Sequence, residues 1–344
     1  MSAVPEGAEV VALEGATPPG PGTPGPGTPG PAALAGTFEQ VVAVVRAAFL
    51  GDDRPVRLAL CCLLAGGHLL VEDHPGVGKT TLAKALARAI GLEFTRVQFT
   101  ADLLPADVTG AVVLDRDSGR LAFRPGPLFT NVLLADELNR ASPKAQSALL
   151  EAMEEHQVSV DGTSHSLPRP FMVIATQNPY DAAGTFPLPQ SQRDRFLMRL
   201  SLGYPDRATE DELLRASNAR PAPEELPVVA GPGFLADFAA ALRAAYVAPA
   251  LRQYILDVVG ATRAHPDVSV GASPRAALSV LRAAVAVALA QGRDFVTPDD
   301  VKAVAEPTLA HRILGHPAAE LTGATTSATI AEILERVPVP VGGG

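Results

Sequence analysis

A short stretch that combines glycines, a lysine and threonines is the part of the sequence best suited to chemistry. It reads His74-Pro75-Gly76-Val77-Gly78-Lys79-Thr80-Thr81 and lies between an apolar run, Leu69–Val71, and a segment with helical apolar spacing. A strand, a glycine-bearing turn and a helix N-terminus in this order present backbone N–H groups to an anion. A lysine in such a turn reaches the β- and γ-phosphates, and the next threonine binds Mg²⁺. We therefore expect residues 74–81 to bind a nucleoside triphosphate, with Thr80 as a metal ligand.

One position departs from the usual phosphate-loop pattern G-x-x-x-x-G-K-[ST]. Asp73 stands where the first glycine of that pattern would be. Gly76, Gly78 and the helix N-terminus remain available to hold phosphates. We therefore interpret the aspartate as an unimportant replacement.

A second apolar run, Val132–Ala135, ends in two acids, Asp136 and Glu137. Ligands of open α/β sheets bind at the carboxyl edge of the strands, which is where these carboxylates would lie. We expect Asp136 to hold Mg²⁺, mostly through water, and Glu137 to polarise a water for in-line attack on the γ-phosphate. Acids at a strand end are often merely solvated, but the phosphate loop upstream favours a hydrolytic site.

The elements that must position these residues alternate between apolar strands and amphipathic helices. A third apolar run, Phe171–Ala175, completes three predicted strands, and helical spacing begins at Phe38 and again after Ser142. This alternation predicts a three-layer α/β domain with a parallel sheet. After Pro205 the strand signal stops, and the pattern predicts a small all-α domain. Its helices are expected over 211–217, 234–246, 251–264, 274–290, 298–309 and 330–337.

The chain begins with a segment of biased composition. Pro18–Pro31 contains seven Pro and five Gly, without the strict triplet of collagen, and predicts a disordered tail with polyproline II character. Docking of a partner on this tail is the less favoured alternative. We therefore expect four segments: a tail over 1–36, the α/β domain over 37–204, the all-α domain over 205–340, and a flexible end over 341–344.

Charge and composition bear on the partners and the compartment. The formal net charge is −9, which argues against a protein that grips nucleic-acid phosphates. The first basic residue is Arg46, so a signal peptide is not expected, and the longest uncharged apolar stretch, Leu58–Val71, is shorter than the about 20 residues of a membrane span. Cys61 and Cys62 are adjacent, as suits reduced thiols. We expect a cytoplasmic protein without membrane insertion.

Several further stretches carry a resemblance to a known family. The run Ala135–Ala141, with Pro143-Lys144 and Gln146–Met153 after it, is similar to the MoxR family of AAA+ ATPases. Seven more stretches extend the match: Gln98–Thr100, Asp102–Pro105, Pro125–Phe129, Ala175–Pro179, Gly184–Pro189, Asp194–Phe196 and Gly271–Ala276. The resemblance runs from about Phe38 to Pro340. It implies an AAA+ core over 37–204 and a helical lid over 205–340.

The resemblance also assigns roles to residues outside the two motifs. Asn178 matches the sensor 1 position, which orients the attacking water, and Arg195 matches the arginine finger that reaches a neighbouring subunit's nucleotide. Arg193, two residues earlier, departs from the family pattern and is the alternative for the finger. Arg275 matches sensor 2, which the resemblance places on the nucleotide of its own chain. His74 and Gln190 also depart from the pattern, and the imidazole of His74 is interpreted as harmless.

The resemblance implies an ATP-hydrolysing, Mg²⁺-dependent, chaperone-like motor that forms a homo-oligomeric ring, expected to be a hexamer. Its clients would be proteins, among them proteins with von Willebrand factor A domains. The segment Gln98–Phe129 corresponds to the insert of this branch and would face the ring's pore or a client. Three alternatives stay open: a motor that remodels nucleic acid, a small-molecule kinase, and a nucleotide-gated scaffold with weak turnover.

Overall fold

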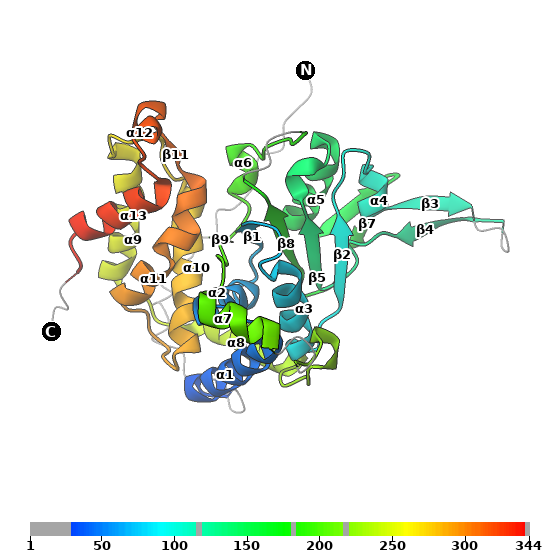
Figure 1. The fold of residues 1–344 in the computed structure, drawn as a ribbon, viewed down its shortest axis with the longest axis horizontal. Helices are drawn as coiled ribbons and strands as arrows, with labels where there is room; N and C mark the ends of the chain where they lie inside the picture. Colours follow the sequence, from blue (N-terminus) through cyan, green and yellow to red (C-terminus); the bar gives the residue numbers. More distant parts are fainter. Residues whose placement is uncertain (1–28, 115–118, 180–183, 216–219, 341–344) are drawn as a thin grey trace, which may run out of the picture.

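The computed structural model describes residues 29–114, 119–179, 184–215 and 220–340. Its first part is built on a parallel five-stranded sheet in the order β2–β5–β8–β1–β9 (Figure 1). The strands are β1 (Leu69–Glu72), β2 (Phe94–Gln98), β5 (Val132–Asp136), β8 (Met172–Gln177) and β9 (Met198–Leu200). The three central strands, β5, β8 and β1, are the three that the sequence predicted, because continuous apolar runs are typical of strands buried on both faces.

Two strands of the five-stranded sheet, β2 and β9, were not predicted from the sequence because they lie at its edges. Strand β2 carries Thr95, Arg96 and Gln98 and is largely half-buried or exposed, so its apolar signal is weak. Strand β9 has only three residues. Edge strands need less apolar surface than central ones, and their sequences are correspondingly harder to recognise.

The central strands send alternate side chains into two separate apolar cores. Leu69 and Val71 of β1 belong to the first core, whereas Leu70 belongs to the second. The first core is shared with α1 (Pro31–Ala48), α2 (Asp53–Leu64) and α3 (Lys79–Ile90), and the second with α5 (Pro143–Glu155). Helices therefore cover both faces of the sheet, which confirms the three-layer α/β fold.

The first helix begins earlier than the sequence predicted. We expected a tail over 1–36, but α1 starts at Pro31. Proline suits the first turn of a helix because its missing N–H has no intrahelical partner there. Leu34 in the second turn is buried in the first core, which fixes residues 31–36 as helix. The rest of the expected tail, 1–28, and the expected flexible end, 341–344, lie outside the described residues.

Two antiparallel hairpins and two short helices are inserted around the sheet. The hairpin of β3 (Gly110–Leu114) and β4 (Leu121–Pro125) projects away from the helical part of the molecule (Figure 1). The second hairpin consists of β6 (Gln157–Val160) and β7 (Thr163–Ser166). The short helices are α4 (Pro105–Thr109) and α6 (Gln190–Arg193).

The second part is helical, as the sequence predicted, with one short antiparallel strand pair of β10 (Val268–Val270) and β11 (Leu314–Gly315). Helix α10 (Pro274–Ala290) lies at its centre and packs against α9 and α11. The remaining helices are α7 (Arg207–Arg215), α8 (Pro232–Ala244), α9 (Pro249–Ala264), α11 (Pro298–Leu309), α12 (Pro317–Leu321) and α13 (Thr326–Arg336). Thr297 and Asp300 form the capping box of α11.

The two parts share one continuous core. The first apolar core extends from the sheet into α8, α9, α10 and α11. Residues after the expected boundary at 205 also pack on the first part, since the N–H of Val229 donates to the carbonyl of Ala89 in α3 (2.9 Å). The boundary at 205 is thus less sharp than the sequence suggested. Among the described residues, no helix is both long and apolar enough to cross a membrane.

Candidate active site

The phosphate loop lies between the end of β1 and the first turn of α3. Gly76 (φ 84°) and Gly78 (φ 91°) both adopt the left-handed conformation that glycine tolerates without strain. The loop therefore turns sharply enough to aim the N-terminus of α3 at a ligand. The ammonium of Lys79 donates to the carbonyls of Asp73 (2.7 Å) and His74 (3.0 Å). Burial lowers its pKa, and nearby carboxylates offset part of that effect.

The two acids follow β5 as expected. Asp136 accepts a hydrogen bond from the hydroxyl of Thr176 (2.6 Å) and pairs with the guanidinium of Arg96 (2.6 Å). Glu137 has a φ of 54°, which is unusual for a residue with a side chain, and its carboxylate pairs with Arg140 (2.9 Å). Its backbone N–H donates to the Thr176 hydroxyl (2.8 Å). A single threonine on β8 thus holds both acids in place.

These motifs meet around one cavity of about 400 Å³. Its lining residues are Pro75, Gly76, Gly78, Lys79, Thr80, Thr81, Arg96, Gln98, Asp136, Glu137, Thr176 and Asn178. The structure therefore brings together the phosphate loop, the acid pair and Asn178, all of which the sequence singled out. Arg96 was missed, and Gln98 and Thr176 lie in stretches that resemble the family but were given no role. For Arg96 and Gln98, recognition of β2 as the neighbour of β5 would have been the signal.

The oxygen donors of this cavity suit a hard divalent cation. Thr80 offers a hydroxyl and Asp136 a carboxylate, and both face the same space. Mg²⁺ prefers oxygen ligands and keeps several waters, so two protein ligands beside a triphosphate are sufficient. The residues present therefore fit Mg²⁺, provided that Arg96 gives up part of its hold on Asp136.

A second cavity of about 400 Å³ also borders the phosphate loop. Val77 of the loop forms one wall. The others come from the segment between α1 and α2, residues 49–52, and from the linker after β9, residues 202–206. The rings of His74 and Tyr204 stack beside it at 4.9 Å. A nucleotide whose phosphates lie on the loop would have this cavity within reach of its base.

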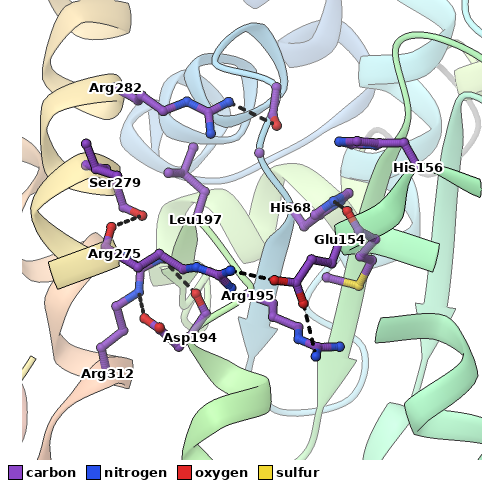
Figure 2. Close-up of a pocket in the computed structure, with 14 residues that line it drawn as sticks. His68, Glu154, His156, Asp194, Arg195, Leu197, Arg275, Ser279, Arg282 and Arg312 are labelled. Carbon is purple, nitrogen blue, oxygen red and sulfur yellow. Dashed lines mark hydrogen bonds and ion pairs between the residues drawn. The ribbon is translucent and has the colours of Figure 1, made fainter. Parts of the chain in front are cut away.

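The two arginines that the resemblance singled out lie elsewhere, in a third cavity of about 360 Å³. Figure 2 shows the guanidinium groups of Arg195 and Arg275 pointing at the carboxylate of Glu154. The N···O distances are 3.0 Å for Arg195 and 2.5 Å for Arg275. The guanidinium of Arg275 holds the pKa of Glu154 below its usual value. Arg193 is not among the residues that line this cavity. Glu154, at the end of α5, was not recognised in the sequence.

The prediction that Arg275 contacts the nucleotide of its own chain stays a prediction, and in this structure Arg275 lines the cavity around Glu154. Arg275 is absent from the residues that line the phosphate-loop cavity, and its partner is Glu154. The reason is the attachment of α10, because Ser273 before its first turn donates to Asp194 (3.0 Å), and Asp194 pairs with the buried Arg312 (2.9 Å). These contacts hold the start of α10 beside Arg195.

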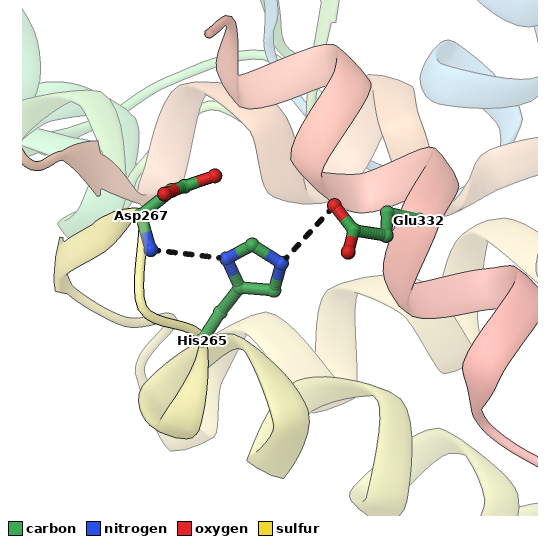
Figure 3. Close-up of side chains that lie close together, drawn as sticks. All are labelled: His265, Asp267 and Glu332. Carbon is green, nitrogen blue, oxygen red and sulfur yellow. Dashed lines mark hydrogen bonds and ion pairs between the residues drawn. The ribbon is translucent and has the colours of Figure 1, made fainter. Parts of the chain in front are cut away.

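One group of potential metal ligands lies in the helical part of the molecule. His265, Asp267 and Glu332 bring ligand atoms within 4.8 Å of one another (Figure 3). The ring accepts the backbone N–H of Asp267 at Nδ1 (3.2 Å), so a neutral ring carries its proton at Nε2, which faces Glu332 (3.4 Å). Glu332 also pairs with Arg336. Nδ1 thus accepts a hydrogen bond and Nε2 lies within ion-pair distance of Glu332, and we interpret the group as a structural contact.

Comparison with known proteins gives matches over most of the chain. Residues 68–198 match the ATPase family associated with various cellular activities (AAA), and residues 260–333 match the AAA lid domain. The chain is 46% identical to the uncharacterized protein YeaC of Bacillus subtilis, over 83% of this chain and 89% of that one. It is 38% identical to the chaperone MoxR1 of Mycobacterium tuberculosis, over 90% and 84% respectively.

Two further matches agree with these. The protein MoxR of Paracoccus denitrificans is 34% identical over 88% of this chain and 96% of its own length. A crystal structure of a candidate ATPase from Cytophaga hutchinsonii superimposes with a TM-score of 0.84 at 35% identity, and covers 90% of this chain and 97% of that one.

Proposed function

Since this chain belongs to the MoxR family of AAA+ ATPases, we propose that it hydrolyses ATP and uses the energy to remodel or activate protein clients. The observation that carries the proposal is the single cavity that joins the phosphate loop, the acid pair and Asn178. A solvated acid pair far from the loop would not support hydrolysis, whereas acids that share a cavity with Lys79 can act on the phosphates that it binds.

The motif residues that line the cavity have distinct roles in this proposal. Lys79 and the N–H groups of residues 74 and 76–81 would hold the β- and γ-phosphates, and Thr80 and Asp136 would hold Mg²⁺. When bound there, the cation would supply positive charge to offset that of the phosphate oxygens. Glu137 polarises the attacking water, and Asn178 orients it. The cavity beside residues 49–52 and 202–206 receives the base.

The arginine pair supports an assembly in which each site is completed by a neighbour. Arg195 and Arg275 share Glu154 and do not line the phosphate-loop cavity of their own chain. We infer that both act in trans on a neighbour's nucleotide, where a phosphate oxygen would replace Glu154 as their partner. A trans arginine stabilises transition-state charge by about 10³–10⁵ in rate. Head-to-tail contacts of this kind close into rings, and we propose a homo-hexamer.

We propose that the substrates on which this ATPase acts are proteins. The β3–β4 hairpin lies within the segment that the sequence assigned to a pore- or client-facing insert, and it exposes Val113, Leu114 and Leu121. Proteins with von Willebrand factor A domains are the proposed clients. The proposal places the protein in the cytoplasm, where the buried free thiols of Cys61 and Cys62 would remain reduced.

A pair of variants tests hydrolysis. Lys79→Ala is expected to abolish binding of MgATP, because the phosphates lose their principal cation. Glu137→Gln is expected to leave binding of MgATP within about threefold of wild type and to lower kcat by at least about 100-fold, the range of a lost general base. Equilibrium binding and phosphate release measure the two effects. Equal ATPase rates in wild type and Glu137→Gln would overturn the catalytic assignment.

A further inference from the structure

The carboxylate of Asp73 accepts four hydrogen bonds. Asp73 stands where the phosphate-loop pattern has its first glycine, and this number of bonds indicates that the aspartate has a role. Its side chain is only 3% exposed. One carboxylate oxygen accepts the N–H of His74 (2.8 Å). The other accepts three donors: the Ser201 hydroxyl (3.0 Å) and the N–H groups of Leu202 (2.5 Å) and Gly203 (2.8 Å).

The donors of the second oxygen belong to the linker that leaves the sheet. Ser201–Gly203 directly follow β9 and lead towards α7 and the helical part. Gly203 has a φ of 69°, which lets the linker turn around the carboxylate. The next residue, Tyr204, stacks its ring on His74 (4.9 Å, interplanar angle 25°). Two consecutive residues of the phosphate loop therefore grip four consecutive residues of the linker.

The backbone of Asp73 ties the same point to the rest of the site. Its N–H donates to the carbonyl of Gln177 on β8 (3.1 Å), and its carbonyl accepts the ammonium of Lys79 (2.7 Å). Burial by itself would raise the pKa of the Asp73 carboxyl, but the four donors hold it below its usual value. A charged acceptor with four donors forms stronger hydrogen bonds than a neutral one.

We propose that Asp73 is a positioning residue that clamps the phosphate loop to the linker at residues 201–203, so that the phosphate site and the adjoining base cavity are held as one rigid unit. The inference rests on the proposed function, in which a nucleotide spans these two cavities. The linker forms one wall of the base cavity, and the loop forms another. A glycine at position 73 could make none of the side-chain bonds that hold the two walls together.

The test compares two ligands and five proteins. The ligands are MgATP, which fills both cavities, and magnesium tripolyphosphate, which has no base. The proteins are wild type, Asp73→Gly, Asp73→Asn, Ser201→Ala and Asp300→Asn. Asp73→Gly restores the glycine of the usual pattern. If Asp73 had no role, this variant would bind both ligands as tightly as wild type does. Asp73→Asn keeps the size of the side chain but places an amide N–H₂ group among N–H donors.

The clamp predicts a loss that depends on the base. Because hydrogen bonds to a charged group contribute strongly, Asp73→Gly should raise the Kd of MgATP by at least about tenfold, and that of tripolyphosphate by about threefold at most. Asp73→Asn should likewise raise the Kd of MgATP more than the Kd of tripolyphosphate. Ser201→Ala, which removes one of four donors, should raise the Kd of MgATP by about threefold.

Asp300→Asn is the matched control for general destabilisation. Asp300 is equally buried, and its carboxylate is bound by Arg293 and Thr297 in the helical part, away from both cavities. It should change stability without changing either Kd. Wild-type affinity for MgATP in both Asp73 variants, or equal losses for MgATP and tripolyphosphate, would overturn the clamp. Failure of the wild type to bind MgATP would instead overturn the proposed function.

Discussion

Thr176 is the residue on which the geometry of the two acids depends most directly. Its hydroxyl donates to Asp136 (2.6 Å) and accepts the backbone N–H of Glu137 (2.8 Å). The hydroxyl thereby fixes the proposed metal ligand and the proposed base relative to each other. Thr176 is almost fully buried on β8, so neither bond is weakened by competition with bulk water.

Replacement of Thr176 by valine should therefore affect turnover more than binding. Valine has nearly the same shape but cannot donate or accept, so the Asp136 and Glu137 groups lose their common partner. We expect kcat for ATP hydrolysis to fall by about 10- to 100-fold, as misplacement of a catalytic group by about 1 Å would produce. The Kd of MgATP should change by about threefold at most, since the phosphate loop is untouched.

The control for this substitution is Thr308→Val. Thr308 is fully buried in α11, and its hydroxyl bonds only to carbonyls of its own helix. The same loss of a hydroxyl there should leave kcat unchanged. An equal fall in kcat for both variants would show that Thr176 acts through stability alone.

At the scale of elements, His68 joins three of them where β1 begins. Its Nε2 donates to the carbonyl of Met153 in α5 (3.1 Å), and its Nδ1 accepts the N–H of Val173 in β8 (3.0 Å). Its backbone carbonyl accepts the N–H of Leu197, just before β9 (2.8 Å). Because Nδ1 accepts a hydrogen bond, the ring fits its place only while it is neutral.

The neutral ring makes stability depend on pH. Burial lowers the pKa of His68 to about 4, from an ordinary value of 6.5. The unfolded chain therefore takes up a proton between pH 6.5 and 4 that the folded protein does not. The contribution of His68 to the free energy of unfolding is fully present above pH 6.5 and falls by about 3 kcal/mol by pH 4.

Urea unfolding at a series of pH values from 4 to 7.5 measures this loss. His68→Gln should remove the part of the loss that His68 contributes, because glutamine keeps a donor and an acceptor but does not titrate. His311, whose burial also lowers its pKa well below the ordinary value, leaves a residual slope in the same direction. An unchanged pH dependence in His68→Gln would contradict the assignment.

The segment 190–196 is attached to the helical part through Asp194 and Arg312. The guanidinium of Arg312 is only 2% exposed and pairs with Asp194 (2.9 Å), while it also donates to the carbonyls of Thr308 and Phe196. Burial lowers the pKa of Arg312 to about 10. A buried cation of this kind is costly once its counter-charge is removed.

Asp194→Asn should therefore lower the free energy of unfolding by about 3 kcal/mol, because Arg312 keeps only carbonyl partners. The double variant Asp194→Asn with Arg312→Met should recover part of this loss, since no charge remains buried. Chemical denaturation measures wild type, Asp194→Asn, Arg312→Met and the double variant. The exposed pair of Asp211 and Arg215 is the control, and Asp211→Asn should cost about 0.5 kcal/mol or less. Additive losses in the double variant would contradict a coupled buried pair.

At the scale of the whole molecule, charge and site geometry are distributed unevenly. The chain has a formal net charge of −9, yet Arg195, Arg275, Arg282 and Arg312 all line the cavity around Glu154. That cavity is thus a cationic region on an acidic molecule, and it is separate from the cavity of the phosphate loop. A phosphate of a neighbouring subunit is the ligand that this arrangement favours.

Mixing of inactive subunits tests this arrangement. Glu137→Gln subunits keep both arginines, and Arg195→Ala subunits keep Glu137, so a mixed ring contains complete sites at about a quarter of its interfaces under random assembly. ATPase activity should therefore appear on mixing. The same should hold for Arg275→Ala, because the structure places Arg275 beside Arg195.

The control mixture combines Glu137→Gln subunits with Lys79→Ala subunits. The two residues line the same cavity within a chain, so neither subunit can supply what the other lacks. This mixture should stay inactive, because no subunit carries both Lys79 and Glu137. Activity in it would show that mixing alone restores turnover, without complementation between neighbouring subunits. If ATPase activity is recovered in the mixture with Arg195→Ala but not in the mixture with Arg275→Ala, then Arg275 acts on the nucleotide of its own chain. Absence of recovery in both mixtures would contradict trans action altogether.

The sequence by itself determined the elements whose signals are local. The phosphate loop, the acids after β5 and the three central strands were predicted because glycine geometry, strand burial and helix capping act over a few residues. The exact bounds of α10 and α11 were predicted for the same reason, since Pro274 and Pro298 each stand in the first turn. Asn178 and Arg195 were named only through the resemblance to a family.

Tertiary structure alone decided the contacts between residues that are distant in the chain. Arg275 meets Glu154 across 121 positions, and the Asp73 carboxylate meets Gly203 across 130. Neither pairing leaves a local pattern, because a side-chain partner at that distance depends on how the helical part docks on the sheet. Local order follows from the chain's own periodicity, whereas the place of the arginines and the role of Asp73 follow from packing.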